Sequence, residues 1–401
     1  MLAARPDLFQ AIAGETHVAL AVSGGSDSMA LLRLVHEFLV PLRVTGRVVP
    51  GFSVLTVDHG LRKESAAEAA QVSAWCAALG LPHQTLRWPG DKPATGIQAK
   101  ARKARYDLMS DWCQAHGATV LMTAHTLDDQ AETVLMRLAR TSSIDSLAGI
   151  HRWSQWNGVR LFRPLLDLKR RDMRVFLQGM SQAWIDDPSN EDERYERVRI
   201  RRALPVLEGL GITPEGLAGL ADRALEASQA LWGATDDWVR LHVIEHESGF
   251  CTVPVQAFAD QTPLLQARIL GWLTSRYGGG KMPEPAELEL LAAWFALGRN
   301  GRRTLGGAII ARRTREMLIG REPGRIDPAP VIVPASGKLM WDKRFEISAA
   351  PGSRIVPAFL AAKLAPPTNL PAFVRDSLPA ILPWASPQTG IVARFCSRLK
   401  S

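Results

Sequence analysis

A loop of small and polar residues between two apolar runs is the first part of this sequence that could do chemistry. The segment LAVSGGSDSMALL, residues 20–32, surrounds one acid with serines and glycines, namely Ser23, Gly24, Gly25, Ser26, Asp27 and Ser28. The run before the loop is typical of a strand and the pattern after it is typical of a helix. Because a helix N-terminus presents unpaired N–H groups and a positive dipole end, the loop is suited to bind phosphate.

The acid of this loop, Asp27, has two interpretations. An acid among phosphates needs a cation between them, which makes Asp27 a candidate Mg²⁺ ligand. An acid in the first turn of a helix also serves the helix dipole without any ligand. The pattern Gly-x-x-x-x-Gly-Lys-Ser/Thr does not occur in the chain, which argues against kinase-type and GTPase-type nucleotide sites.

A second polar cluster lies in TAHTLDDQAETVLMRLAR, residues 123–140. We expect His125, Asp128, Asp129 and Glu132 in the first turns of one helix, with His125 and Asp129 on the same face. An amine nucleophile must lose its proton to a nearby base, and such a cluster can supply one. Capping remains the alternative for the acids, and a capping or core role remains the alternative for His125.

Both clusters fall where strand-like and helix-like segments alternate. Apolar runs at 17–23, 51–58, 83–88 and 119–124 precede helical patterns at roughly 27–39, 64–79, 96–115 and 128–140. This rhythm predicts an α/β fold whose doubly wound, mostly parallel sheet is covered on both faces. Ligands of such folds bind at the carboxyl ends of the strands, where SGGSDS, DHGLRKE and HTLDDQ fall.

The remaining chain suggests further domains. Residues 160–210 look helical, and 213–300 are helical apart from the extended piece GFCTVPV. A β-like stretch and a proline-rich segment follow. We therefore expect a catalytic domain over 1–215, a mainly helical domain over 216–322, a linker over 323–337 and a small domain with β character over 338–401.

Composition limits the partners and the compartment. The chain has 401 residues, a formal net charge of +8 and a pI near 9.6, which favours a polyanionic partner. Its four cysteines form no Cys-x-x-Cys pair, so no zinc or redox motif is indicated. No apolar run is long enough for a membrane span and the N-terminus lacks a signal-peptide core, so we expect a cytoplasmic protein without a membrane partner.

Taken in order, the motifs resemble the PP-loop ATP pyrophosphatases and, more closely, the bacterial tRNA(Ile)-lysidine synthetases. The resemblance spans about 180 residues and rests on five marks: SGGSDS, DHGLR (58–62), QAKARKARY (98–106), HTLDDQAET (125–133) and DDPSNEDERYERVRIRR (186–202). It implies a Rossmann-like PP-loop ATPase domain followed by a helical, tRNA-binding domain and a small C-terminal domain.

The resemblance also implies a reaction. ATP would adenylate the C2 carbonyl oxygen of the wobble cytidine in the CAU anticodon of an isoleucine tRNA. The ε-amine of L-lysine would then attack C2, giving lysidine, AMP and pyrophosphate. Mg²⁺ would accompany ATP, and a homodimer is among the assemblies that the sequence leaves open.

Site residues follow from the matching motifs. The resemblance implies catalytic roles for Asp27, Arg105, His125 and Asp129, with Asp27 as the metal ligand. It places ATP on the loop from Ser23 to Ser28 and on the pair Asp58 and His59. It assigns substrate binding to Glu132, Arg194, Arg197 and Arg201. Arg105 can supply a bidentate fork to phosphate, although KARKAR is also an ordinary basic helix face.

One turn departs from the family pattern. After the HTLDDQ helix the family has a glycine-rich Arg-Gly-Ser/Thr-Gly turn, whereas this chain has Arg140, Thr141, Ser142 and Ser143. Thr and Ser accept positive φ poorly, so we expect a loop of another shape and do not carry a nucleotide contact over to Arg140.

Other functions stay open at this point. A tRNA thiolase of the same superfamily would need paired cysteines, and an amide-forming ligase would need an ammonia source, and the sequence indicates neither. A noncatalytic RNA-binding relative would not need the complete set of Asp27, Arg105, His125 and Asp129. Basic pairs at 302–303 and 312–313 fit a large polyanion such as tRNA or, more simply, a solvated face.

Overall fold

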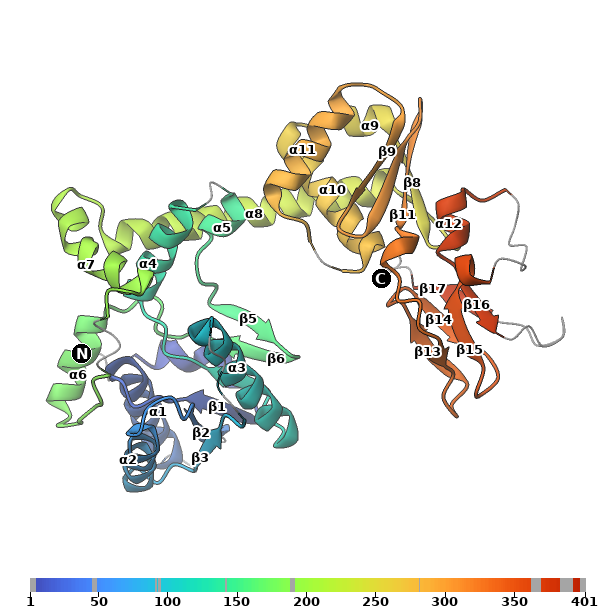
Figure 1. Ribbon diagram of the computed structural model, residues 1–401. Helices are drawn as coiled ribbons and strands as arrows, with labels where there is room; N and C mark the ends of the chain where they lie inside the picture. The colour runs from blue at the N-terminus through green and yellow to red at the C-terminus, as the bar shows by residue number, and fades with distance from the viewer. Residues whose placement is uncertain are drawn as a thin grey trace. The chain divides into compact units, whose positions relative to one another are not determined.

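The computed structural model describes residues 5–44, 49–90, 92, 95–140, 143–187, 192–280, 282–361, 369–382 and 392–396. The chain forms two compact units, residues 1–228 and 229–401, and helix α8 (Pro214–His242) contains the boundary between them (Figure 1). The division into four segments at 215, 322 and 337 stays a prediction.

The first unit is built on a six-stranded sheet. Its strands are β1 (His17–Ala21), β2 (Gly51–Asp58), β3 (His83–Arg87), β4 (Val120–Met122), β5 (Trp153–Trp156) and β6 (Val159–Phe162). The strand order is β3-β2-β1-β4-β6-β5, and every neighbouring pair except β5 and β6 is parallel. The order reverses between β1 and β4, which is where such sheets open a crevice for ligands.

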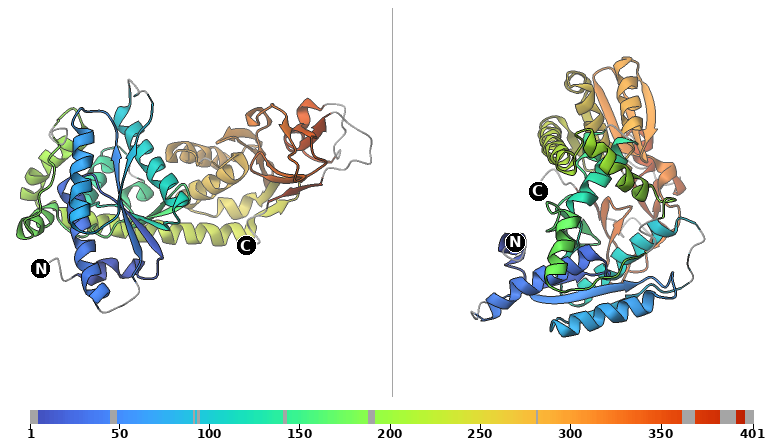
Figure 2. Two further views of the ribbon diagram at one scale, coloured as in Figure 1. Left: turned by 90° about the horizontal axis from the view of Figure 1, so that it is seen from below. Right: turned by 90° about the vertical axis from the view of Figure 1, so that its left-hand side faces the viewer.

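Helices cover both faces of this sheet (Figure 2). Alternate strand residues point to opposite faces, so Val18 and Leu20 belong to one core and Ala19 to the other. The first core contains residues of the 3₁₀ helix η2 (Pro6–Ile12), α1 (Ser26–Val44), α2 (Ser65–Ala78) and α6 (Arg170–Gly179). The second contains residues of α3 (Ile97–Ala115). The expected α/β architecture is confirmed.

The hairpin of β5 and β6 was not expected, and the prediction that residues from 160 onward are helical is wrong for residues 160–162, which lie in β6. Asn157 and Gly158 connect the strands with φ of 46° and 81°. Two positive φ values match the tight turns whose twist suits a hairpin, and Asn-Gly is the strongest sequence signal for them. The signal was present in the sequence, between Trp156 and Val159.

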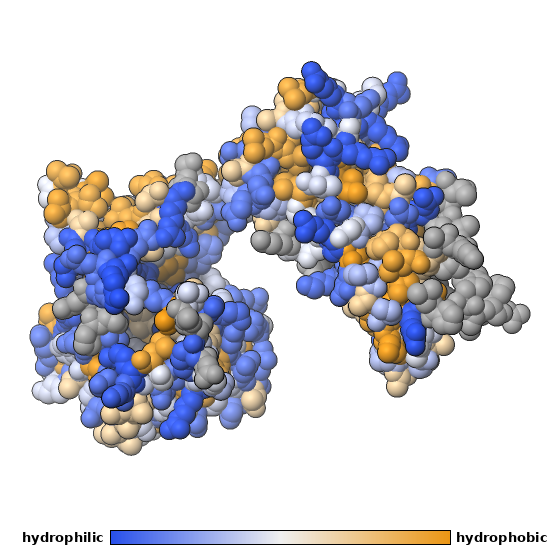
Figure 3. Space-filling model, in the orientation of Figure 1, coloured by the Kyte–Doolittle hydropathy of each residue, from blue (hydrophilic) through white to orange (hydrophobic). Residues whose placement is uncertain are grey.

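The first unit also contains the helices α4 (Leu127–Leu138), α5 (Ile144–Leu147) and α7 (Glu196–Gly209). Helix α4 packs against α7 around Ala131, Val134 and Leu204. Figure 3 shows hydrophobic surface near the end of α7, where Val206 and Leu210 are exposed. Among the described residues, no helix has the length and apolar character to cross a membrane.

The second unit combines helices with antiparallel sheets. Its largest sheet has the order β7-β8-β11-β10-β9, from β7 (Ile244–His246), β8 (Phe250–Pro254), β9 (Gly301–Leu305), β10 (Ala308–Arg312) and β11 (Glu316–Arg321). The helices are α9 (Val255–Ala259), α10 (Pro263–Gly278) and α11 (Pro285–Ala296), followed later by the short α12 (Ala372–Asp376).

Two three-stranded sheets follow, which confirms the expected β character of the terminal part. One contains β12 (Val331–Ile332), β15 (Arg354–Pro357) and β16 (Pro379–Leu382), and the other contains β13 (Lys338–Trp341), β14 (Phe345–Ser348) and β17 (Val392–Phe395). Short 3₁₀ turns occur at η4 (Pro323–Arg325) and η5 (Ala358–Leu360). Within the proline-rich segment, Ile326 and Val333 are buried in the same core as Ile310 of the large sheet.

Candidate functional site

The loop at residues 23–28 links β1 to α1 and is held in shape from outside. Gly24 has a φ of +92°, and a Cβ at this position would lie 2.7 Å from Cδ1 of Ile185. The backbone N–H of Ile185 donates to the Gly24 carbonyl at 2.9 Å. Only glycine satisfies both the positive φ and the close approach, so the glycine in this loop is required by packing as well as by any ligand.

Serine hydroxyls close the loop from inside. Ser28 Oγ donates to the carbonyl of Gly25 at 2.9 Å and accepts the backbone N–H of Ser23 at 3.2 Å. Ser26 is 8% exposed and lies at the first position of α1. The loop therefore places the N-terminus of a helix beside the end of β1, as a phosphate site requires.

The second cluster begins one residue before a helix. Thr126 is the N-cap of α4 and forms a capping box with Asp129. The Oδ2 atom of Asp129 accepts the N–H of Thr126 at 2.9 Å and its hydroxyl at 3.0 Å. The expectation that His125 lies in the first turn of the helix is wrong, because His125 precedes the extended N-cap residue and so cannot share a helical face with Asp129.

His125 is nevertheless held at the site. Its Nδ1 atom lies 2.9 Å from Thr123 Oγ1. Burial lowers the pKa of His125, and nearby arginines, Arg163 among them, lower it further against the opposing effect of Asp129. The imidazole is therefore neutral at neutral pH.

The centre of the site contains three carboxylates, Asp27, Asp129 and Glu132, which we call the acid cluster. The guanidinium of Arg170 lies between them. Arg170 Nε lies 2.9 Å from Asp27 Oδ2, Nη2 lies 3.1 Å from Asp129 Oδ1, and Nη1 lies 3.4 Å from Glu132 Oε1. Asp27 follows β1 and the other two follow β4, so the cluster forms where the strand order reverses.

Two arginines of α7 reach the same cluster. Glu132 has no exposed side-chain surface, and Nε of Arg197 and Nε of Arg201 lie 3.0 Å and 2.7 Å from its carboxylate. These arginines are four residues apart, on one face of the helix. Arg194 is not brought to the cluster, because its 84% exposed side chain pairs with Asp192 at 2.6 Å.

Burial and nearby charges shift the pKa values of Asp27 and Asp129 in opposite directions. Burial raises the pKa of Asp27, and Arg170 opposes this shift. Burial alone would also raise the pKa of Asp129, but Arg170 and His125 outweigh burial, so the pKa of Asp129 is lowered. The pKa of Arg170 is raised because its three acid partners outweigh its burial. Arg170 is therefore a permanent cation that helps Asp129 to stay ionised.

Arg105, on α3, has a different environment from Arg170. Among the described residues it forms no ion pair within 4.0 Å, although its charge lowers the pKa of both His59 and His125, which places it near both. Burial lowers the pKa of Arg105 itself. A buried guanidinium without a carboxylate partner is suited to bind phosphate.

The pair at the end of β2 has mixed roles. Asp58 Oδ1 accepts the N–H of Gly60 at 2.9 Å and the hydroxyl of Ser65 at 2.7 Å, contacts that lower its pKa and organise the turn. The Nδ1 atom of His59 is buried and has no hydrogen-bond partner among the described residues. His59 is thus the member of this pair that has a donor or acceptor left for a ligand.

A metal ion fits this site only when it is shared with a ligand. Among the described residues, no group of three His, Cys, Asp or Glu side chains could hold a metal. Mg²⁺ usually keeps several waters and takes one or two carboxylates together with substrate phosphates. Asp27, at the first turn of α1 beside the loop, meets that description.

Arg170, one of three consecutive basic residues at 169–171, was not singled out from the sequence. The structure also gives Asp128 a role, since its Oδ2 atom accepts the backbone N–H of Arg170 at 2.7 Å. The sequence did contain one signal for Arg170. A cation at the first position of a helix is unfavourable for the helix dipole, so an arginine there suggests that acidic side chains elsewhere contact it. The buried Arg163, which donates to the carbonyl of His151 at 2.6 Å, carried no such signal.

Part of two predicted motifs lies outside the residues that the structure describes. Thr141 and Ser142 of the altered turn, and residues 188–191 of the last motif, lie outside the described residues. Arg140 pairs with Glu196.

Cys76 and Cys113 are buried in the cores on opposite faces of the sheet, where burial raises the pKa of each thiol to about 12. They cannot pair with each other or supply a reactive thiolate.

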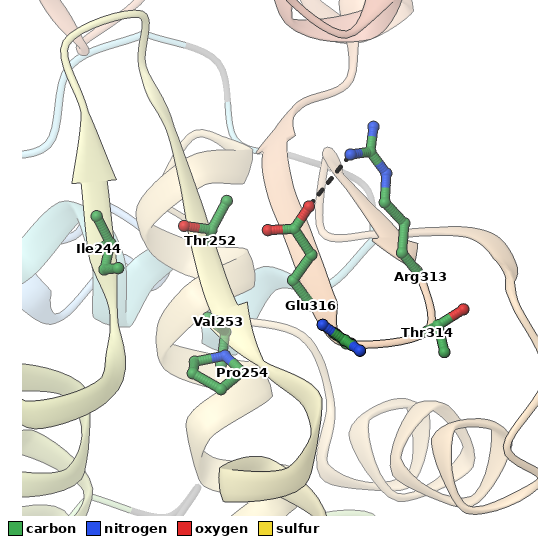
Figure 4. Close-up of a pocket in the computed structure, with 8 residues that line it drawn as sticks. Ile244, Thr252, Val253, Pro254, Arg313, Thr314 and Glu316 are labelled. Atoms are coloured by element: carbon green, nitrogen blue, oxygen red, sulfur yellow. Dashed lines mark hydrogen bonds and ion pairs between the residues drawn. The ribbon is translucent and has the colours of Figure 1, made fainter.

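The second unit has a cavity of about 540 Å³ between β8 and the turn that joins β10 to β11 (Figure 4). Arg313 and Glu316 pair across that turn at 3.2 Å. Thr252 and Pro254 line the opposite side. None of the motif residues lies in this cavity, so it adds nothing to the site in the first unit.

Several known proteins are similar to this chain over most of its length. The PP-loop domain family matches residues 3–207. The tRNA(Ile)-lysidine synthase of Rhodopseudomonas palustris is 41% identical over 319 residues, which are 77% of this chain and 91% of that protein. The protein of the same name from Ruegeria pomeroyi is 39% identical over 335 residues, which are 82% of this chain and 75% of that protein.

One solved structure shows a weaker likeness. The U34-tRNA thiolase NcsA from Methanococcus maripaludis, with its [4Fe-4S] cluster, has a TM-score of 0.47 and 15% identity, covering 55% of this chain and 78% of that chain. This likeness is too low to bear on function.

Proposed function

Since the chain belongs to the tRNA(Ile)-lysidine synthase family, we propose that it joins L-lysine to C2 of the wobble cytidine in the CAU anticodon of an isoleucine tRNA, with ATP as the second substrate. The reaction has two steps. The C2 carbonyl oxygen attacks the α-phosphate of ATP and pyrophosphate leaves. The ε-amine of lysine, after losing a proton, then attacks C2 and AMP leaves.

One observation supports this proposal above the others. The phosphate-type loop after β1 and the acid cluster residues after β4 meet at the point where the strand order reverses, and Arg170 links them directly. A reaction that joins a nucleotide to an amine needs a phosphate site and a cation-binding acidic site side by side. A thiolase would instead need a reactive thiolate, and the buried Cys76 and Cys113 do not offer one.

Each group has a role that its environment supports. The loop at 23–28 binds the β- and γ-phosphates of ATP through backbone N–H groups at the start of α1. Arg105, without a carboxylate partner, neutralises charge on the phosphate or the adenylate. Neutral His125 accepts a proton at the reacting base. Asp129 and Glu132 hold the lysine ammonium, while Arg197 and Arg201 fix the position of the Glu132 carboxylate.

Mg²⁺ is part of the proposal through Asp27. When bound, the ion would neutralise the phosphate oxygens that carry the negative charge of ATP. Asp27 contributes a carboxylate at the N-terminus of α1. Its Oδ2 atom contacts a cation in this structure, the guanidinium of Arg170. The cytoplasm, where tRNA is modified, is the proposed location, and a homodimer stays a prediction.

Transfer of labelled lysine under single-turnover conditions tests the function. We expect unmodified tRNA with a CAU anticodon to gain one lysine per molecule, with AMP and pyrophosphate formed in equal amounts. The same tRNA with U in place of the wobble cytidine is the matched control and should gain none. Binding of the CAU tRNA without lysine transfer or AMP formation would leave the chain as a noncatalytic RNA-binding relative.

A further inference from the structure

Arg170 lies where a substrate cation would have to lie. Its guanidinium is within 3.4 Å of all three members of the acid cluster, and its side chain is only 16% exposed. The neighbouring Arg171, in the same helical turn, is 76% exposed, and its one ion-pair partner within 4.0 Å among the described residues is Asp172, at 3.5 Å. Two adjacent arginines therefore differ completely in their environment, and only one of them is built into the site.

The backbone also fixes Arg170 in place. The N–H of Leu127 donates to the Leu168 carbonyl at 2.9 Å, and Asp128 accepts the N–H of Arg170. Both contacts tie the start of α6 to the start of α4, the helix that carries Asp129. A cation at the first position of α6 is unfavourable for the helix dipole, so the acid cluster must outweigh that cost.

We propose that Arg170 is a built-in placeholder for the amine substrate: in the free chain its guanidinium occupies the place beside Asp129 that the ammonium of lysine takes during the reaction. The proposal rests on the proposed function for the identity of the amine. It goes beyond that function because it assigns to Arg170 the control of when the amine can enter.

The partners of each carboxylate support this assignment. Glu132 keeps two further arginines, Arg197 and Arg201, when Arg170 moves away. No other ion pair within 4.0 Å reaches Asp27 or Asp129 among the described residues. Without Arg170, Asp27 would keep only the Ser26 hydroxyl at 3.4 Å, and Asp129 only the backbone N–H and hydroxyl of Thr126, so neither carboxylate would have a cation as a partner. Departure of Arg170 thus creates a need for two cations, one at each carboxylate. The ion that accompanies ATP meets the need at Asp27, and the lysine ammonium meets the need at Asp129.

This arrangement couples the two substrates. A cation that takes Asp27 removes one of the three partners of Arg170 and weakens its hold on Asp129. Nucleotide binding should therefore increase the affinity for the amine, and linkage requires the amine to increase the affinity for the nucleotide by the same factor. Lysine that enters before ATP must instead compete with a guanidinium already in place.

Calorimetry can measure this coupling directly. L-Lysine is titrated into the full-length chain with and without the Mg²⁺ complex of a non-cleavable ATP analogue, for wild type, R170M, R170K and R171M. In wild type we expect the nucleotide to tighten lysine binding about tenfold, within the usual range of coupling between sites. R170M should bind lysine about tenfold more tightly than wild type without nucleotide, and should gain little more when nucleotide is added.

The other two variants provide the controls. R171M removes an exposed neighbour of the same type and should behave as wild type. R170K keeps the charge but loses the fork that reaches three carboxylates, so its lysine affinity without nucleotide should lie between those of wild type and R170M. Equal coupling in wild type and R170M, or weaker lysine binding by R170M, would overturn the placeholder and make Arg170 a structural residue or a direct ligand of the lysine carboxylate.

Two further measurements keep these outcomes separate. Titration with 1,5-diaminopentane, which has no carboxylate, should repeat the lysine result; if R170M weakens lysine binding but not diamine binding, Arg170 is a carboxylate ligand. If R170M is unstable, added lysine should raise its melting temperature more than that of R171M, and an equal rise would count against the proposal. If the diamine follows the expected pattern but wild type transfers no lysine to tRNA, the placeholder stands and the proposed function fails.

Discussion

Buried arginines occur in both units of the molecule, but they contact different kinds of acceptor. In the first unit the guanidinium of Arg170 contacts three side-chain carboxylates. In the second unit Arg344 is 1% exposed, pairs with Asp342 at 2.7 Å and donates from Nη2 to the carbonyl of Ser377 at 3.0 Å. Arg321 pairs with the same Asp342 and donates to the carbonyls of Gly278, Gly307 and Arg325.

The kind of acceptor decides whether another cation can replace the arginine. Backbone carbonyls cannot leave a guanidinium without moving the chain, so Arg321 and Arg344 join β11, α10 and the last segments into one core. Carboxylates on side chains can exchange one cation for another of the same charge, so the Arg170 site can serve a substrate. Buried arginine alone therefore does not mark a functional site, whereas the kind of acceptor does. The predictions below test the two sides of this comparison, beginning with the largest effect.

The largest effect is expected for Asp27→Asn, because it removes the carboxylate that serves the nucleotide cation. The rate of AMP formation should fall about 10⁴-fold, or ~5.5 kcal/mol in activation free energy. Single-turnover AMP release in saturating ATP and Mg²⁺ measures it. Asp172→Asn changes an exposed acid beside Arg171 and is the matched control. A wild-type rate in Asp27→Asn would reduce Asp27 to a partner of the helix dipole.

A smaller loss is expected for His125→Ala, about 10³-fold in lysine transfer, which is typical for removal of a general base. Affinity for ATP should change much less, because the loop at 23–28 does not depend on His125. His36→Ala, on α1 with Glu37 as its partner, is the control. Normal transfer by His125→Ala would leave only its contact with Thr123, and the imidazole would then be a structural group.

The second unit should respond in stability rather than in rate. Asp342→Ala leaves Arg321 and Arg344 buried without their carboxylate, which should cost about 3 kcal/mol in the free energy of unfolding of this unit. Urea unfolding followed by tryptophan fluorescence measures the loss. The ATP dissociation constant of the protein that remains folded should equal that of wild type. A change in ATP binding without a loss of stability would remove the distinction between the two arginine groups.

The sequence predicted the nucleotide half of the site better than the amine half. The loop at 23–28 is a local feature, and its glycine and serines are next to one another in the chain. The contacts of Arg170 depend on packing between α6, α4 and α1, over separations of 38 to 143 residues. The misplacement of His125 has a local cause, because the capping box of Thr126 and Asp129 makes Thr126 the N-cap, so the helix begins at Leu127 and His125 lies before it.

The smallest effect concerns the exposed arginines of the second unit, which lie outside both buried groups. Arg302 and Arg303 are exposed on β9, the edge strand of the large sheet, and neither forms an ion pair within 4.0 Å among the described residues. Arg303 lies 4.7 Å from the ring centroid of Trp294, an arrangement suited to a cation that also meets a base or a phosphate. Arg313, by contrast, already pairs with Glu316.

Each phosphate contact contributes roughly 0.7 to 0.9 to the slope of log affinity against log salt concentration. The double variant Arg302→Ala with Arg303→Ala should therefore flatten the slope for tRNA binding by about 1.4 to 1.8, while Arg313→Ala should flatten it by less because its charge is already compensated. Filter binding over a salt series measures the three slopes, with the ATP dissociation constant unchanged throughout. Coincident slopes for wild type and the double variant would make β9 a solvated edge, and the charge that holds tRNA would then have to lie elsewhere in the chain.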